Sequence, residues 1–401
     1  MTLTEPTDTT SPDEQRVVEL VEQLLAEHPP ATTDPVTFLG AQYDLGLGWV
    51  HFPEGYGGLG LSPKVQRPVA VRLGEARAPV AYARNPIGCG MGAPTVVTHG
   101  SEEQKQRYLR PLFTGEEIWC QLFSEPGAGS DVASLSATAV RDGDEWILNG
   151  QKVWTTLAHL SRFGMIIART NPDIPKHKGL TYFVVDMHAP GVEVRPLRQM
   201  TGEAEFNEVF FTDVRIPDRE RLGDVGEGWR VALTTLMNER VSIGGAIQPQ
   251  GSGIIREALA AWQRTDRTDE VARDRLMQLW SDAEVLRLTN IRAQQLRSKG
   301  VPGPEGSVGK IMSAELNKRV TELAVDLQGP EGMLYTSYEF VRPESALRWD
   351  CPQKGFLRMR ANSIEGGTTE VMKNILGERV LGLPGDVRTD KELPWKDVPR
   401  S

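Results

Sequence analysis

The stretch SATAVRDGDEWILNGQKVWTT, residues 136–156, marks the change of period that decides the fold class. Apolar residues recur at helical spacing before it, whereas here the turn dipeptides Asp142–Gly143 and Asn149–Gly150 separate short runs rich in β-branched and aromatic residues. Four more runs of this kind follow: FGMIIART, LTYFVVDM, GVEVRPL and NEVFFTDVRI. The sequence therefore predicts a compact all-β domain in the middle of the chain.

Helical segments flank this β domain on both sides. Ser11, Pro12 and Glu14 form a capping box ahead of an apolar stripe, and Ser101 begins a second S-x-x-Q cap. Long apolar stripes return in the last third, for example from Leu276 to Ile291 and from Leu316 to Leu327. We therefore expect an α+β multidomain protein with an α-helical N-terminal domain (1–120), a middle β-barrel (121–232), a C-terminal four-helix bundle (233–385) and a loosely ordered tail (386–401).

Length and charge narrow the class of protein. A chain of 401 residues exceeds the size at which single cores stop growing, so two or three domains are expected. The net charge of −9 disfavours a nucleic-acid partner. Three widely spaced cysteines suit reduced thiols better than a disulfide framework, and no apolar run is long enough for a membrane span. We expect a cytoplasmic protein that binds neither nucleic acid nor membrane.

Common catalytic motifs are weak or missing in this sequence. GYGGLG, residues 55–60, has the G-x-G-x-x-G form, but Ser62–Pro63 follows it where a dinucleotide site needs a helix. There is no G-x-S-x-G, and the six histidines lack H-x-x-x-H spacing. Serine hydrolase and zinc enzyme hypotheses therefore have little support, and no metal site is expected.

Two short stretches could bind a flat or phosphorylated ligand. In FSEPGAGSD, residues 123–131, glycines leave the backbone uncovered between Ser124 and Ser130, so its N–H groups could face a ring or a phosphate. In KVWTT, residues 152–156, Trp154 and Thr156 share one face of a strand, where an indole could cover a planar ligand. An ordinary tight loop and ordinary packing remain the alternatives.

The stretch LTTLMNERVSIGGAIQ, residues 233–248, carries an isolated carboxylate. On a helix Glu239 shares its face with uncharged residues only, among them Ala232, Thr235 and Leu236. A carboxylate on such a face must be paired or must tolerate a raised pKa. A buried ion pair and a functional acid are both compatible with this pattern.

Taken together, several motifs resemble the acyl-CoA dehydrogenase family over nearly the whole chain. They are FPEGYGGLGLSP, GSEEQKQRYLRPLFTGEEIWCQLFSEPGAGSD, DEWILNGQKVWTT, FNEVFFTDVRIP, GEGWRVALTTLMNER and EGGTTEVMKNILGERVLGLP, in the family's order. The resemblance implies helical, β-barrel and four-helix-bundle domains, and an FAD held partly across a subunit interface of a dimer or homotetramer.

By position, the resemblance also assigns site residues. It assigns FAD contacts to Phe123, Ser124, Gly129, Ser130, Trp154, Thr156, Thr368 and Glu370, and acyl-CoA contacts to Ser130, Arg240 and Gly366. Two motifs depart from the family: its interface Arg-x-x-Phe-Gly is absent, and its Gln-x-x-Gly-Gly-x-Gly is here DLQGPEG, with Asp326 and Pro330 altered. The adenosine end of FAD is then held differently, or the partner subunit is a different chain.

Two acids compete for the role of catalytic base. In many family members the base directly precedes Gly-Thr, and that position is Gly366 here, so Glu365 is offset by one residue. A second branch, with isovaleryl-type and long-chain enzymes, places its base on a bundle helix, at the position of Glu239. The resemblance therefore implies that Glu239 is the base and that the Gly366 N–H, with a flavin ribityl hydroxyl, binds the thioester oxygen.

The implied activity is FAD-dependent α,β-dehydrogenation of an acyl-CoA to its trans-2-enoyl-CoA, with electrons passed to an electron-transferring flavoprotein. Two alternatives stay open. The chain could be a non-catalytic FAD-binding subunit of a heteromeric acyl-CoA dehydrogenase, as the altered motifs suggest. It could also be an oxygen-using oxidase or monooxygenase of the same fold, although a retained base argues against a monooxygenase.

Overall fold

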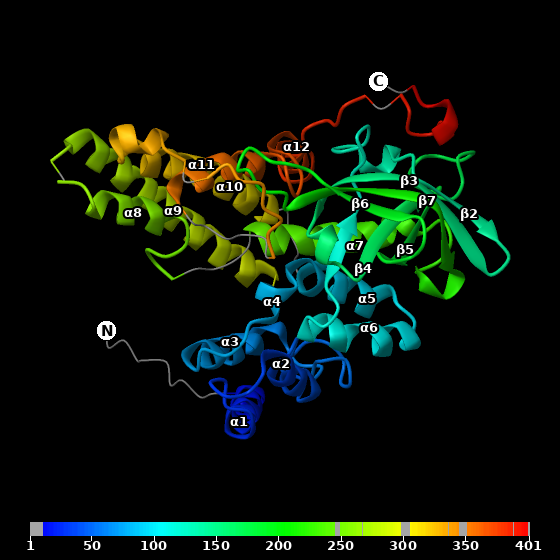
Figure 1. Ribbon diagram of the computed structural model, residues 1–401, viewed down its shortest axis with the longest axis horizontal. Helices are drawn as coiled ribbons and strands as arrows, with labels where there is room; N and C mark the ends of the chain where they lie inside the picture. The colour runs from blue at the N-terminus through cyan, green and yellow to red at the C-terminus, as the bar shows by residue number, and fades with distance from the viewer. Residues whose placement is uncertain are drawn as a thin grey trace. The chain divides into compact units, whose positions relative to one another are not determined.

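The structure is a computed structural model (Figure 1). It comprises two compact units, and the division between them falls between Trp119 and Cys120. The described residues are 11–244, 249–266, 268–297, 305–335, 337–344, 351–387 and 389–399.

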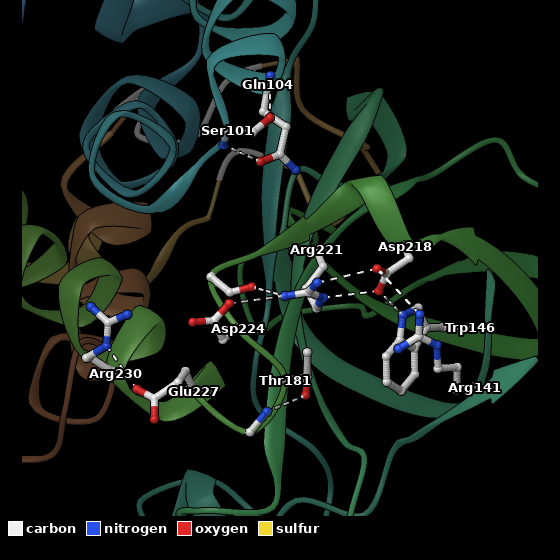
Figure 2. Close-up of polar contacts among 12 residues, drawn as sticks. Ser101, Gln104, Arg141, Trp146, Thr181, Asp218, Arg221, Asp224, Glu227 and Arg230 are labelled. Atoms are coloured by element: carbon white, nitrogen blue, oxygen red, sulfur yellow. Dashed lines mark hydrogen bonds and ion pairs between the residues drawn. The ribbon is translucent and has the colours of Figure 1, made fainter. Parts of the chain in front are cut away.

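The first unit is helical, as the sequence predicts. Its helices are α1 (Pro12–Glu27), α2 (Pro35–Asp44), α3 (Gln66–Glu75), α4 (Ala81–Arg84), α5 (Ala93–His99) and α6 (Glu102–Thr114). Both capping boxes are confirmed: the Glu14 N–H donates to Ser11 Oγ at 3.2 Å, and the Gln104 N–H donates to Ser101 Oγ at 3.2 Å (Figure 2). These hydrogen bonds satisfy backbone donors that have no partner within the helix.

The GYGGLG stretch is a packed loop of this first unit. A Cβ on Gly57 would lie 2.5 Å from Tyr43 Cε2, and one on Gly58 would lie 2.1 Å from the Phe52 carbonyl oxygen. Gly57 also has φ +78°, a conformation that favours glycine. Tight packing therefore accounts for these glycines.

The second unit begins with the sheet that the sequence predicts. Its strands are β1 (Trp119–Leu122), β2 (Thr138–Asp142), β3 (Glu145–Thr156), β4 (Phe163–Arg169), β5 (Leu180–Asp186), β6 (Val192–Pro196), β7 (Phe206–Pro217) and β8 (Arg221–Leu222). The strand order is β6-β7-β3-β2-β4-β5-β8, and β1 pairs with β4. Side chains such as Leu148, Phe183 and Phe211 form its core. Closure of this sheet into a barrel stays a prediction.

One of the two predicted turns is correct. Asp142 pairs with Glu145 around Gly143, which has φ +64°, so β2 and β3 form a tight hairpin. The predicted turn at Asn149–Gly150 is wrong, because both residues lie inside β3 at a break in its register with β7. A Cβ on Gly150 would lie 2.6 Å from that of Ala137, so this glycine allows a close approach of two backbones.

Polar contacts join the hairpin to the segment that leads into the next helix. Trp146 Nε1–H donates to the Asp218 carboxylate at 2.7 Å, and Arg221 Nε donates to the same carboxylate at 3.1 Å (Figure 2). The Gly226 N–H donates to Thr181 Oγ1 at 3.1 Å. These contacts fix the start of the first helix after the sheet.

The remaining helices are α7 (Gly228–Gly244), α8 (Ile255–Gln263), α9 (Glu270–Arg297), α10 (Glu305–Asp326), α11 (Pro352–Arg358) and α12 (Thr369–Arg379). Helix α10 packs against α7, α8, α9, α11 and α12. The predicted apolar stripes are confirmed, since Leu276, Leu279, Leu316, Val320 and Leu323 share one buried cluster. No described helix is both long and apolar enough to cross a membrane.

The C-terminal segment is docked, contrary to the expectation of a loosely ordered tail. Trp395 is buried and donates its Nε1–H to the Ser134 carbonyl at 3.2 Å, and the Arg169 guanidinium lies 4.6 Å from the indole centroid. Lys176 bridges Asp131 and Asp390, each at 2.7 Å. A single buried tryptophan thus outweighs the polar, proline-rich composition on which the expectation rested.

Candidate active site

A buried ion pair anchors the loop that carries FSEPGAGSD. The Glu125 carboxylate accepts hydrogen bonds from the N–H groups of Ser136 (2.6 Å) and Ala137 (2.9 Å) and from Lys152 Nζ (2.9 Å). Lys152 Nζ also donates to the Phe123 carbonyl at 3.0 Å. Burial lowers the pKa of the Lys152 ammonium, although the charge of Glu125 opposes this shift. The base of the loop is therefore rigidly held to β3.

The tip of this loop is open. The N–H groups of Glu125 and Ala128 each donate to the other residue's carbonyl at 3.0 Å, so the chain turns sharply. A Cβ on Gly127 or Gly129 would meet nothing within 4 Å, and Ser130 is exposed. A rigid loop with an uncovered tip suits a bound phosphate or ring.

Trp154 has a strained backbone and an exposed indole. Its φ is +59°, and it lies in β3 where the register with β7 shifts between Lys152 and Thr155. The side chain is 57% exposed and contacts Phe206 edge-on, with ring centroids 5.9 Å apart. Left-handed backbone at a bulky residue costs on the order of 1–3 kcal/mol and is retained mainly at functional sites. Thr156, which flanks the buried Thr155, is half-buried.

Two buried hydroxyls test whether this region fits a cofactor. Thr155 Oγ1 and Thr369 Oγ1 are buried and have no hydrogen-bond partner within the described part of the chain. Buried polar groups are almost always hydrogen-bonded, so water, a ligand or a residue outside the described part of the chain completes each one. Thr155 adjoins Trp154, and Thr369 lies between Thr368 and Glu370, so both adjoin residues that the sequence assigns to FAD. The residues present therefore fit a bound FAD.

Arg358 connects the Trp154 region with the loop before α12. Its guanidinium contacts the Glu205 carboxylate at 3.2 Å and the Glu365 carboxylate at 3.1 Å, and it lies 5.2 Å from the centroid of the Phe206 ring. Burial disfavours this charge, but the two carboxylates together raise the pKa of Arg358. Trp154, Phe206, Arg358 and Glu365 thus form a continuous chain of contacts.

Glu365 is occupied by these structural contacts. Besides Arg358, the Asn362 amide Nδ2 donates to its carboxylate at 2.5 Å. Gly366 and Gly367 follow with φ values of +64° and +93°, and Thr368 Oγ1 accepts the Val371 N–H at 3.2 Å to cap α12. The turn therefore leads straight into the N-terminus of a helix, where backbone N–H groups are unsatisfied.

Glu239 lies half-buried on α7. On the described part of the face that it shares, Ala232 is buried, and Thr235 Oγ1 lies 3.0 Å from the hydroxyl of Tyr182. The carboxylates of Glu365 and Glu239 both act on the charge of Lys310, a residue of α10. Helix α10 packs against both α7, which carries Glu239, and α12, which follows the Gly366 turn, so α10 is a common neighbour of these two features. The side chain of Arg240 lies outside the described residues.

The predicted site residues thus fall into three groups. The Ser124 carbonyl oxygen accepts the Val153 N–H at 2.9 Å, which ties the loop containing Phe123 to the strand of Trp154 and Thr156. Gly129 and Ser130 lie beyond this contact, at the open loop tip. The third group is Glu239, Gly366, Thr368 and Glu370, around α7 and the start of α12.

Sequence reasoning missed the residues that hold these groups in place, chiefly Lys310 and Arg358. Lys310 could have been found by the same reading of helix faces that singled out Glu239, because Ser307 and Ala314 at offsets of three and four are uncharged. No local pattern distinguishes Arg358, whose partner Glu205 is distant in sequence.

Comparisons with known proteins agree with this architecture. Residues 14–116, 120–214 and 226–381 match the N-terminal, middle and C-terminal domains of acyl-CoA dehydrogenase. FadE34 of Mycobacterium tuberculosis, an acyl-CoA dehydrogenase, is 40% identical over 85% of this chain, which spans 45% of FadE34. IpdE1 of the same organism, also an acyl-CoA dehydrogenase, is 39% identical over 85% of each chain.

A solved structure is similar over a still larger part of the chain. The Tcur3481-Tcur3483 steroid ACAD superposes with a TM-score of 0.72 and 26% identity, covering 96% of this chain and 100% of that one. Domain matches in sequence order, relatives near 40% identity and a shared α+β fold agree with one another. The chain therefore belongs to the acyl-CoA dehydrogenase family of oxidoreductases.

Proposed function

We propose that this protein catalyses the FAD-dependent α,β-dehydrogenation of an acyl-CoA thioester, with Glu239 as the base. The observation that carries the proposal is that α10 packs against both α7, which carries Glu239, and α12, which follows the turn at Gly366, while Lys310 of α10 donates a hydrogen bond to the Gly367 carbonyl. Glu365, the competing acid, is held by Arg358 and Asn362. An acid engaged in two structural contacts is a poor candidate for a base that must reach a substrate carbon.

The cofactor would be held by the loop tip, by Trp154 and by the start of α12. Phe123, Ser124, Gly129, Ser130, Trp154, Thr156, Thr368 and Glu370 are the proposed contacts. The open loop tip and the two buried, unpartnered hydroxyls support this proposal. Bound FAD supplies the acceptor for the hydride that leaves the β-carbon.

The residues of the chain move the proton and stabilise charge. The α-proton of a thioester is too weakly acidic for an unassisted carboxylate, so negative charge on the thioester oxygen must be stabilised. We assign this role to the Gly366 N–H, in a turn whose positive φ values only glycine adopts readily. Glu239 then takes the α-proton while the β-hydrogen leaves with its electron pair, and a carbon–carbon double bond forms. Ser130 and Arg240 are the further proposed contacts of the acyl-CoA.

The substrate class and the partners are finer proposals. We infer a bulky, steroid-derived acyl group, supported by the likeness to a steroid ACAD. The altered DLQGPEG motif supports assembly as a dimer or tetramer. The proposed partner is a second copy of this chain or a homologous chain, since the name of the similar structure joins two proteins, Tcur3481 and Tcur3483. An electron-transferring flavoprotein is the proposed acceptor, in a cytoplasmic setting.

A substrate panel with an artificial electron acceptor tests this function. Straight-chain C4 to C16, branched and steroid-derived CoA thioesters are compared, and the steroid-derived thioesters are expected to give the highest kcat/KM. No turnover of any thioester by the yellow, FAD-loaded chain would favour a non-catalytic subunit, to be checked by adding homologous partners. Rapid peroxide release in air would favour an oxidase.

A further inference from the structure

Lys310 is a buried cation on α10, the helix that packs against both α7 and α12. Its side chain is only 1% exposed, which is rare for lysine unless the ammonium is paired. Four acids act on its charge: Glu239 from α7, Glu315 from its own helix, Glu365 from the loop before α12 and Glu370 from α12. A lysine placed among these elements has a role beyond packing to explain.

The ammonium holds the turn at Gly366 directly. Lys310 Nζ donates a hydrogen bond to the Gly367 carbonyl oxygen. The turn is then fixed at three successive points, because Glu365 before it is paired with Arg358, and Thr368 after it caps α12. Backbone donors stabilise a developing negative charge well only when they are held in place before the reaction.

We propose that Lys310 is a positioning residue of this active site, whose ammonium holds the Gly366–Gly367 turn in the conformation that presents the Gly366 N–H to the thioester oxygen. This role rests on the proposed function, because it assumes that the Gly366 N–H binds that oxygen. Burial lowers the pKa of Lys310, and the charges of Glu365, Glu239, Glu370 and Glu315 oppose this shift.

Two substitutions separate the hydrogen bond to the turn from the charge. Lys310→Gln keeps an N–H donor for the Gly367 carbonyl but removes the charge, whereas Lys310→Met removes both. Lys318→Gln is the matched control, since it removes a lysine of the same helix that is paired with Glu315. All variants are prepared as the full chain, and their FAD content is measured before any other comparison.

A measurement without substrate tests the proposal. Amide hydrogen exchange over residues 366–371 should accelerate at least tenfold in Lys310→Met and less than threefold in Lys310→Gln. Lys318→Gln should match the wild type.

The kinetic readout is the rate of flavin reduction by an acyl-CoA. This rate should fall at least tenfold in Lys310→Met and should be largely restored in Lys310→Gln, which keeps the donor. Unchanged hydrogen exchange in Lys310→Met, or an equal loss of rate in both variants, overturns the proposal. If the wild type reduces its flavin with none of the acyl-CoAs tested while hydrogen exchange responds as expected, the proposed function fails and the role of Lys310 in the turn stands.

Discussion

Replacing Arg358 by Met should weaken the second unit more than any ordinary surface change. Met replaces the aliphatic part of the side chain but lacks the guanidinium that contacts Glu205 and Glu365. Glu205 is buried and Glu365 is half-buried, so the substitution leaves two carboxylates near each other without their shared cation. Like charges in such a place repel, and neither can be fully hydrated.

The expected loss follows from these contacts. Removing one partner of a buried ion pair costs about 3–5 kcal/mol. At about 2 °C per kcal/mol for a large unit, the melting temperature should fall by about 6–10 °C. Arg360→Met is the matched control, because Arg360 lies two residues away, pairs with Glu322 at 2.9 Å and is partly exposed. Its loss should cost no more than about 1 kcal/mol.

Calorimetry of the full chain checks this prediction. The double variant Arg358→Met with Glu365→Gln removes one of the two uncompensated charges, so it should recover part of the lost melting temperature. The reasoning is refuted if Arg358→Met melts within 2 °C of Arg360→Met, or if Glu365→Gln lowers stability further in the Arg358→Met background.

Three further predictions concern Trp154, the C-terminal segment around Trp395 and the three cysteines. Trp154→Gly relieves a left-handed φ, so the free energy of unfolding of the FAD-free protein should change by less than about 1 kcal/mol. The Kd for FAD should rise at least tenfold, and equal FAD affinity would contradict the proposed contact. Trp395→Ala should release the C-terminal segment, which limited proteolysis would then cut at least tenfold faster; an unchanged rate would mean that the indole does not hold it. At pH 8 a thiol reagent should modify Cys351 alone in the native protein and all three cysteines after denaturation. The reason is that Cys89 and Cys120 are buried, and burial raises the pKa of Cys120 to about 12. Rapid labelling of a second cysteine in the native protein would contradict this prediction.

Local sequence patterns predicted the features that depend on neighbouring residues. The capping boxes at Ser11 and Ser101, the hairpin at Asp142–Gly143 and the apolar stripes of α9 and α10 all use spacings of two to four residues. Each is decided by side chains and turns within one element. Such features need no knowledge of the tertiary structure.

Features that depend on distant residues were missed or mistaken. Asn149–Gly150 has the composition of a turn, but Asp213 on another strand makes two hydrogen bonds with Asn149 and continues the sheet across a bulge. Lys310 and Arg358 owe their roles to partners on other elements. Family resemblance supplied Glu239 and Gly366, and it could not supply the residues that support them.

Anaerobic stopped-flow measurement of flavin reduction by an acyl-CoA tests the central claim, that Glu239 is the base, most directly. Glu239→Gln should keep its FAD but reduce it at least about 10²–10⁴-fold more slowly, the usual loss for a general base. Glu365→Gln loses a structural contact with Arg358 and should reduce its flavin within tenfold of the wild-type rate. A Glu239→Gln variant that is reduced normally, beside an inactive Glu365→Gln variant, would contradict the account.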